Sequence, residues 1–253
     1  MTLKNYFSTE LKKLKAPPRA AFFLGSNYIG GGISRLKFLN LKTAEVRQLL
    51  THPHPVFLKS LQHQFEEFEP IWFSASVFEL HMLPVYWLES LTDDQLVSLA
   101  SQLILWADRV DNWAISDSLC GIYARIFERA PKALMPTLKV WNRHSNPWLR
   151  RISMVSLFYY SRLRKKHPSL RLIKSLIKPH FLAREYYVQK AIGWTLRESH
   201  NIYPIETKKF LENNLHQIDA RAWSAASKKL PSNIKQNLNE KRRHFRKNNK
   251  SIK

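Results

Sequence analysis

The chain has 253 residues and a formal net charge of +22, with 41 Lys and Arg against 19 Asp and Glu. Hydrophobic residues make up 44% of it, enough for a sizeable core, which excludes a wholly disordered chain. Six glycines exclude collagen-like and most glycine-loop nucleotide-binding architectures, and a single cysteine excludes a disulfide scaffold or a cysteine-based zinc site. The large excess of positive charge indicates a polyanionic partner.

The elements expected along the chain are nearly all helices. Thr92-Asp93-Asp94-Gln95 is a capping box that predicts a helix through about Val110, and Asn146-Pro147 is typical of another helix start. Strand signals are nearly absent. We therefore predict an all-α fold of about a dozen helices, paired and stacked as HEAT-like repeats into a curved superhelix (solenoid), with an irregular bundle as the alternative. Five prolines between apolar periodic segments are expected to separate helices: Pro136, Pro168, Pro179, Pro204 and Pro231.

Two segments differ from this helical body. Residues 25–32 hold four of the six glycines and predict a flexible loop or a close backbone approach. They lack the spacing of a phosphate-binding loop, so we expect no nucleotide there. Residues 241–253 carry seven Lys and Arg and no acid, which predicts a disordered basic tail after a single domain over residues 1–240. The tail would either add phosphate affinity or only keep the chain in solution.

The positive charge is unevenly distributed along the chain. Residues 139–190 hold 13 Lys and Arg and one acid, Glu185, whereas residues 1–138 hold 14 Lys and Arg and 13 acids. This polarity favours a phosphate-binding face over a generally basic surface. An anionic membrane would be better matched by a single basic amphipathic helix, and no run approaches the roughly 20 apolar residues that cross a bilayer.

A tryptophan and a carboxylate lie on the same side of one predicted helix. In the segment from Asn112 to Cys120, the apolar stripe passes through Ile115 and Leu119 and continues to Ile122 and Ile126. Trp113 and Asp117 lie one turn apart on the opposite side, near Cys120 and Ala124. The functional interpretation is an exposed aromatic beside a carboxylate. The alternative is a tryptophan that packs on a neighbouring helix and an ordinary surface acid.

Two further segments combine tryptophan with cations. Between Tyr187 and Ser199 the core side is Val188, Ile192, Thr195 and Ser199, so Trp194 points outward with Lys190 and Arg197. This arrangement suits a sugar–phosphate backbone, although a packing tryptophan with snorkelling cations would give the same pattern. Trp148, Arg150 and Arg151 open another helix, where arginines oppose the helix dipole unless an anion is bound.

These motifs occur in the same order as in the AlkD-like DNA alkylation repair family, which the chain resembles over roughly residues 20–230. The resemblance rests on Trp113-x-x-x-Asp117, Asn146-Pro147-Trp148-Leu149-Arg150-Arg151 and Ile192-Gly193-Trp194-x-Leu196-Arg197, with an early segment from Phe38 to Arg47. It implies a curved stack of HEAT-like repeats that grips duplex DNA and releases N3- or N7-alkylated purines as a monofunctional glycosylase. Asp117 would be the catalytic acid, and Trp113 and Trp194 the aromatics beside the lesion's deoxyribose. The chain differs from the family pattern at Ala114 and Ser116.

The remaining site assignments concern DNA contact. Arg151 matches the arginine that holds the backbone near the lesion, with Arg150 as the alternative counterpart, and Trp148, Lys190 and Arg197 are expected to contact DNA. We expect no cofactor, no metal ion and no membrane partner. The resemblance implies a cytoplasmic, nucleoid-associated monomer that acts on alkylated duplex DNA in base excision repair. The rival hypotheses are a non-catalytic DNA-binding module that recognises shape or branched structures, and, more distantly, an RNA-binding helical repeat protein.

Overall fold

A computed structural model of the chain describes residues 1–16 and 34–248, with side chains up to residue 245. Over these ranges the regular elements are α-helices and short 3-10 helices, and no strand occurs apart from an isolated bridge between Lys37 and Val77. The prediction of an all-α fold is therefore confirmed. The glycine-rich segment 25–32, for which a loop was predicted, lies outside the described residues.

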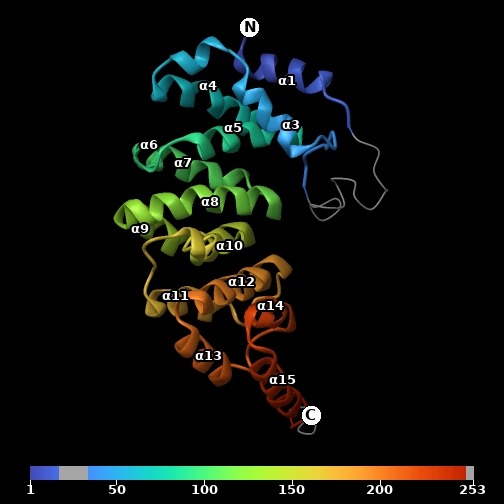
Figure 1. The fold of residues 1–253 in the computed structure, drawn as a ribbon, viewed down its shortest axis with the longest axis vertical. Coiled ribbons are helices and arrows are strands. Elements are labelled where there is room, and N and C mark those ends of the chain that lie inside the picture. The colour runs from blue at the N-terminus through green and yellow to red at the C-terminus, as the bar shows by residue number, and fades with distance from the viewer. Residues whose placement is uncertain (17–33, 249–253) are drawn as a thin grey trace. The chain divides into compact units, whose positions relative to one another are not determined.

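The chain divides into two compact units, Met1–Arg129 and Ala130–Lys253 (Figure 1). The charge divides at the same place. Residues 1–129 carry 13 Lys and Arg and 13 Asp and Glu, whereas residues 130–253 carry 28 Lys and Arg and 6 Asp and Glu. The whole net charge of +22 therefore belongs to the second unit. The assignment of residues 1–240 to one domain stays a prediction.

The first unit is built around α5 (Phe78–Ser90), which is buried continuously from Glu79 to Leu88. A helix that is apolar on all sides belongs in the middle of a core, and α5 contacts helices on several sides. Among the described residues, the other α-helices of this unit are α1 (Leu3–Lys13), α3 (Thr43–Gln48), α4 (Leu61–Ser74), α6 (Asp93–Ser98), α7 (Ala100–Leu103) and α8 (Trp113–Arg129). Its 3-10 helices are η2 (Leu49–Thr51), η3 (Pro55–Leu58) and η4 (Ile104–Arg109).

The predicted helix after Thr92 begins where the sequence placed it but does not run unbroken to Val110. Thr92 and Gln95 form the complete capping box at the start of α6. The α-helical pattern is interrupted at Leu99, resumes as α7 and ends in η4, so the segment is helical in three pieces. Aromatic packing accompanies this change: Trp106 in η4 is fully buried, stacks on Trp72 with ring centroids 4.8 Å apart, and accepts a hydrogen bond at its backbone carbonyl from the Trp72 indole.

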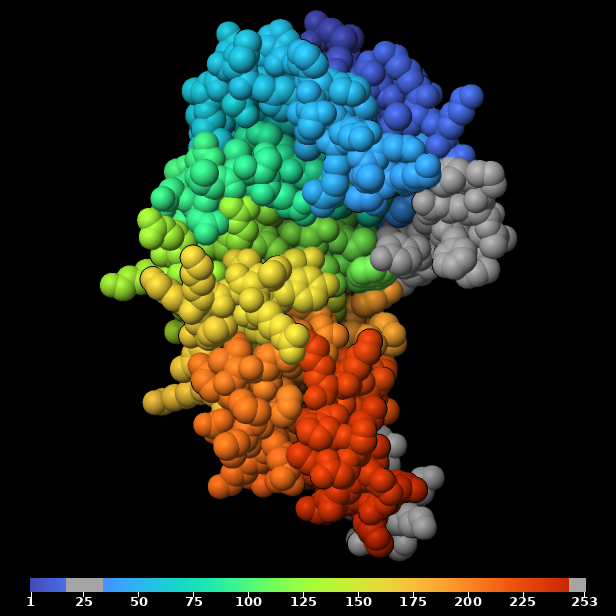
Figure 2. All heavy atoms as spheres, viewed as in Figure 1, coloured from blue at the N-terminus to red at the C-terminus, as the bar shows by residue number. Residues whose placement is uncertain are grey.

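The second unit is arranged around α12 (Tyr186–Ile202), which contacts α10, α11, α13 and α14. The other α-helices are α9 (Pro131–Asn142), α10 (Pro147–Val155), α11 (Leu170–Ile177), α13 (Pro204–Asn213), α14 (Ala220–Ala226) and α15 (Ser232–Asn248). The 3-10 helices are η5 (Ser161–Leu163), η6 (Lys178–His180) and η7 (Ser227–Lys229). Figure 2 shows the atoms of α13 beside those of α15, and an ion pair joins Glu212 of α13 to Lys241 of α15.

Two predictions about helix boundaries differ from the structure. Pro136 lies inside α9, because Pro131 at its first turn starts the helix and the buried residues Leu134 and Leu138 continue its apolar stripe through the proline. Residues 241–248 belong to α15, where a disordered tail was predicted, and the buried Arg242 donates two hydrogen bonds to the carbonyls of Leu215 and Ile218. Residues 249–253 lie outside the described residues.

Gly193 allows α12 and α14 to approach each other closely. A Cβ atom at this position would overlap the backbone carbonyl oxygen of Ala222 and come within 2.8 Å of the Ala225 Cβ. Backbone cannot move aside as a flexible side chain can. The glycine of the Ile192-Gly193-Trp194 motif is therefore explained by helix packing.

We expect Gly193→Ala to lower the free energy of unfolding by about 1–3 kcal/mol, the usual cost of overpacking. Helix propensity alone predicts the opposite sign, since alanine is favoured over glycine in a helix by about 1 kcal/mol. Urea unfolding of the two proteins gives the sign directly, and a variant more stable than the wild type would contradict the packing explanation.

His81 gives the first unit a defined pH dependence. Its side chain is 1% exposed and lies 4.1 Å from Trp72 between ring centroids, and neither ring nitrogen has a hydrogen-bond partner among the described residues. Burial, reinforced by the positive charges of Arg109 and Arg35 and opposed by Asp111, lowers the pKa of His81 from 6.5 to about 3. The folded protein therefore holds this imidazole neutral.

Between about pH 6.5 and pH 3 the unfolded chain binds a proton at this position that the folded chain does not, so acid favours unfolding. From pH 7 to pH 5 we expect His81 to lower the free energy of unfolding by about 2 kcal/mol. His81→Leu should remove this part of the pH dependence while all other titrating groups remain. Equal pH dependence in denaturant titrations of both proteins would contradict the assignment.

Candidate functional site

The predicted site residues are distributed over both units. Trp113 and Asp117 lie on the first two turns of α8 in the first unit. The other six lie in the second unit, on the first turns of α10 or along α12: Trp148, Arg150, Arg151, Lys190, Trp194 and Arg197.

The start of α8 is fixed by a polar cluster. The buried Asn112 accepts a hydrogen bond at its side-chain oxygen from the backbone N–H of Ile115, at 3.1 Å, which caps the helix. Its amide nitrogen donates to Asp111, at 2.9 Å, and Asp111 also accepts hydrogen bonds from the Ser34 hydroxyl and the Arg35 backbone. Asn112, which precedes Trp113, is thus fixed by hydrogen bonds to both Ile115 and Asp111.

Trp113 and Asp117 are both partly exposed, as the sequence pattern indicated. The predicted stripe is confirmed, since Ile115, Leu119, Ile122 and Ile126 are all fully buried or nearly so. Cys120 and Ala124, the small residues expected near Trp113 and Asp117, are both buried. The partly exposed face of α8 that holds Asp117 continues instead through Gly121 and Arg125.

The first turns of α10 and α12 are brought together by arginine. Asn146 caps α10 through a 2.9 Å hydrogen bond from the Trp148 backbone N–H, as predicted. Arg150 forms a 2.5 Å ion pair with Glu185 at the start of α12, and the hydrogen bond from Arg150 lowers the pKa of that carboxyl group. The buried Arg151 donates to the backbone carbonyl of Tyr187 at 3.0 Å.

These contacts give a protein-internal reason for the two arginines. The sequence pattern suggested a bound anion because arginines oppose the dipole at a helix start. Glu185 supplies that negative charge to Arg150, and the Tyr187 carbonyl supplies an acceptor to Arg151. Arg151 is only 5% exposed and Arg150 keeps 16% of its side chain exposed, so Arg150 is the more accessible of the two candidates for backbone contact.

Trp194 lies on the outward side of α12, as predicted, and the structure adds partners that the spacing did not show. Val188, Ile192, Thr195 and Ser199 are buried on the other side of the helix. The Arg197 guanidinium lies 5.4 Å from the centre of the Trp194 ring, within cation–π range. Tyr159 and Tyr160, which the sequence interpretation missed, lie with ring centroids 6.0 Å and 5.7 Å from that of Trp194.

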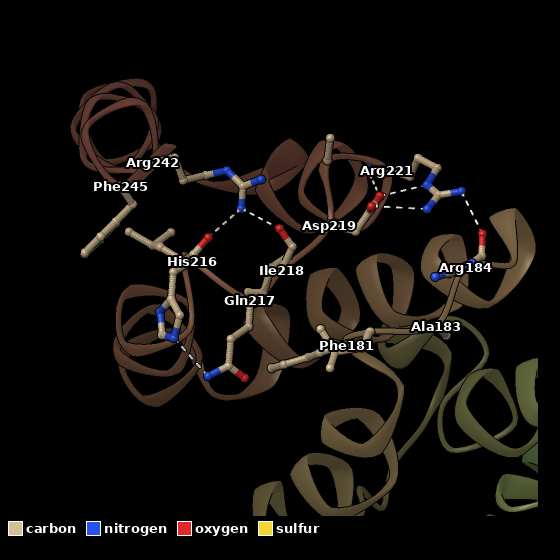
Figure 3. A pocket seen from close by; sticks show the side chains of 13 residues that line it. Phe181, Ala183, Arg184, His216, Gln217, Ile218, Asp219, Arg221, Arg242 and Phe245 are labelled. Atoms are coloured by element: carbon tan, nitrogen blue, oxygen red, sulfur yellow. Dashed lines mark hydrogen bonds and ion pairs between the residues drawn. The ribbon is translucent and has the colours of Figure 1, made fainter. Parts of the chain in front are cut away.

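A separate hollow of about 420 Å³ lies between the loop before α12, the segment 215–221 and α15 (Figure 3). None of the predicted site residues lines it. Its arginines are largely engaged: Arg221 pairs with Asp219 at 2.8 Å and donates to the Arg184 carbonyl, while Arg242 donates to two backbone carbonyls. These contacts join α14 to the loop before α12 and α15 to the segment before α14.

Within the described ranges, no group of three His, Cys, Asp or Glu residues is placed to hold a metal ion. The helices of those ranges also include none with the length and apolarity needed to cross a membrane.

Comparison with known proteins agrees with this architecture. The profile of a family described as DNA alkylation repair enzyme matches residues 7–230. A solved structure from Enterococcus faecalis, described as a predicted DNA alkylation repair enzyme, superposes with a TM-score of 0.65 at 16% identity, over 87% of this chain and 99% of that one. This likeness shows a shared fold. No curated protein matches the chain significantly.

Proposed function

Because this chain belongs to the family of DNA alkylation repair enzymes, we propose that it hydrolyses the N-glycosidic bond of N3- or N7-alkylated purines in duplex DNA. The observation that carries the proposal is the start of α8. There a partly exposed carboxylate, Asp117, lies one turn beyond a partly exposed tryptophan, Trp113, on a helix whose other sides are buried. The polar cap at Asn112 holds that helix start in place.

The reaction needs no general acid to protonate the departing base. Alkylation at N3 or N7 gives the purine a positive charge, so the base leaves as a neutral molecule when it takes the electron pair of the bond to C1′. The sugar develops the positive charge instead. An ionised Asp117 would stabilise that oxocarbenium-like sugar and accept a proton from the water that attacks C1′. Trp113 and Trp194 would add cation–π attraction to the sugar and limit water access.

The charge of the second unit supports a duplex as the partner. All of the net charge lies in residues 130–253, and Glu185, the one acid among residues 139–190, is already paired with Arg150. Lys190, Arg197, Arg150 and Trp148 would contact the sugar–phosphate backbone, whereas Arg151, which is buried, would act by holding α12. Such binding weakens as salt rises, because phosphate contacts release counterions.

We expect Asp117→Asn to slow release of free base from methylated duplex DNA by about 10²–10³-fold, the effect of removing one preorganised electrostatic group. Duplex affinity should be retained, because the change removes no cation. The measurement is single-turnover base release at saturating enzyme.

Asp94→Asn is the matched control. Asp94 is an exposed carboxylate of the same unit, paired with Arg129 at 2.7 Å, and its loss should leave base release unchanged. Equal rates for the wild type and Asp117→Asn would remove Asp117 from the mechanism. Tight duplex binding by a wild type that releases no base would overturn the glycosylase proposal and favour the non-catalytic DNA-binding module.

A further inference from the structure

Glu198 is a buried carboxylate that joins α12 to the turn after α10. It is 1% exposed, and one of its oxygens accepts hydrogen bonds from the Ser161 backbone N–H at 3.0 Å, the Ser161 hydroxyl at 2.7 Å and the Asn201 amide at 3.1 Å. The other oxygen lies 3.1 Å from the Arg197 guanidinium and 3.5 Å from the Lys229 ammonium. A charge buried this completely is tolerated only with such partners.

These contacts hold Glu198 in its charged form. Burial by itself raises the pKa of the carboxyl group, but the hydrogen bonds from Ser161, with the charges of Lys229 and Arg197, outweigh it and lower the pKa below its usual value. At neutral pH Glu198 is therefore a fixed anion between two segments of the second unit.

The turn that Glu198 holds has an unusual backbone. Tyr159 has φ of 43°, in the left-handed region that a bulky side chain rarely adopts. Strain of this kind persists where surrounding contacts over-determine the conformation, and it is concentrated at functional sites. Ser161, two residues further on, is the residue that Glu198 binds through both its backbone and its side chain.

The turn and α12 together present one group of rings and a cation. Tyr159 and Tyr160 meet edge-to-face, with centroids 4.7 Å apart, and both approach Trp194. Tyr160 is 47% exposed, which is a large fraction for an aromatic residue next to two other rings. The Arg197 guanidinium, 5.4 Å from the centre of the Trp194 ring, completes the group. We call Tyr159, Tyr160, Trp194 and Arg197 the aromatic surface.

The positive charge around the aromatic surface favours a partner that carries phosphates. Residues 162–167, which follow the turn directly, hold four Lys and Arg and no acid. Exposed rings flanked by cations fit a ligand that has planar apolar faces and a phosphate at each step, and base stacking on aromatic side chains is the usual mode for unstacked nucleotides.

We propose that Tyr160 stacks on an unstacked nucleotide of the bound DNA, and that Glu198 is a positioning residue that holds Tyr160 and Arg197 around Trp194. The inference deepens the proposed function, on which it rests for the assignment of Trp194 to the DNA face. It adds a residue that contacts DNA outside the matching motifs and a reason for the acid that follows Arg197.

The test compares two DNA ligands, an intact duplex and the same duplex with one unpaired 2-aminopurine opposite an abasic analogue. We expect Tyr160→Leu to weaken binding of the second ligand by about 5- to 100-fold, the range for loss of one base–aromatic stack, and to abolish the quenching of 2-aminopurine on binding. Affinity for the intact duplex should change by less than about 2-fold, because phosphate contacts remain.

Two variants control this comparison. Tyr160→Phe keeps the ring and should bind both ligands as the wild type does. Phe245→Leu removes another exposed ring of the same unit, in the hollow of Figure 3, and should also bind both normally. Equal losses on both ligands, or none, for Tyr160→Leu would overturn the stacking assignment. Binding does not require catalysis, so this result is separable from the base-release experiment.

The positioning role of Glu198 is tested by combining its variant with Tyr160→Leu and measuring binding of the duplex with the unpaired 2-aminopurine. Glu198→Gln and the milder Ser161→Ala should each weaken binding of the unpaired ligand, by about 3-fold or more. In a Tyr160→Leu background, Ser161→Ala should add nothing, because the ring that Ser161 helps to position is gone, and Glu198→Gln should add only the part of its loss that acts through Arg197. Fully additive losses would show that Glu198 and Ser161 act independently of Tyr160 and would overturn the positioning role. Ser161→Ala provides the answer if Glu198→Gln does not fold.

Discussion

The backbone N–H groups of Leu39, Leu41 and Ser161 lie outside the α-helices, and each donates to a carboxylate buried on a neighbouring helix. Irregular segments of a helical protein lack a regular backbone hydrogen-bond pattern, so their N–H groups need acceptors from other elements. Glu79 on α5 and Glu198 on α12 supply them. Both helices lie at the centre of their units, so these irregular segments are fixed by the central helix of each unit.

Pairing with arginine also engages several of the few acids in the second unit. The second unit has six acids for 28 Lys and Arg, and Glu185, Glu198 and Asp219 each bind an arginine side chain. These three acids lie where their contacts order the chain. Little other negative charge remains in the second unit to repel a polyanion. Positive charge is left in excess across a unit whose core is otherwise built of apolar helices, as expected for a protein that binds a phosphate backbone.

The predictions that rested on helical periodicity were confirmed where one face of one helix decided them. The buried stripes of α8 and α12, the cap at Asn146 and the capping box at Thr92 are local patterns, and local patterns are readable from spacing. Predictions failed where neighbours intervened. Pro136 lies within α9, whose buried residues continue on both sides of it, and the helix after Thr92 is interrupted at Leu99, before the buried Trp106.

The sequence by itself determined the helical class of the fold, the polarity of charge and the outward placement of Trp113, Asp117 and Trp194, because each follows from composition or from a period within one element. Only the tertiary structure decided what surrounds them. Tyr160 meets Trp194 from 34 residues away, Glu198 reaches Ser161 across 37, and Gly193 is required by a helix that begins at Ala220. Contacts between distant segments depend on how helices pack, and packing joins residues that no spacing along the chain relates.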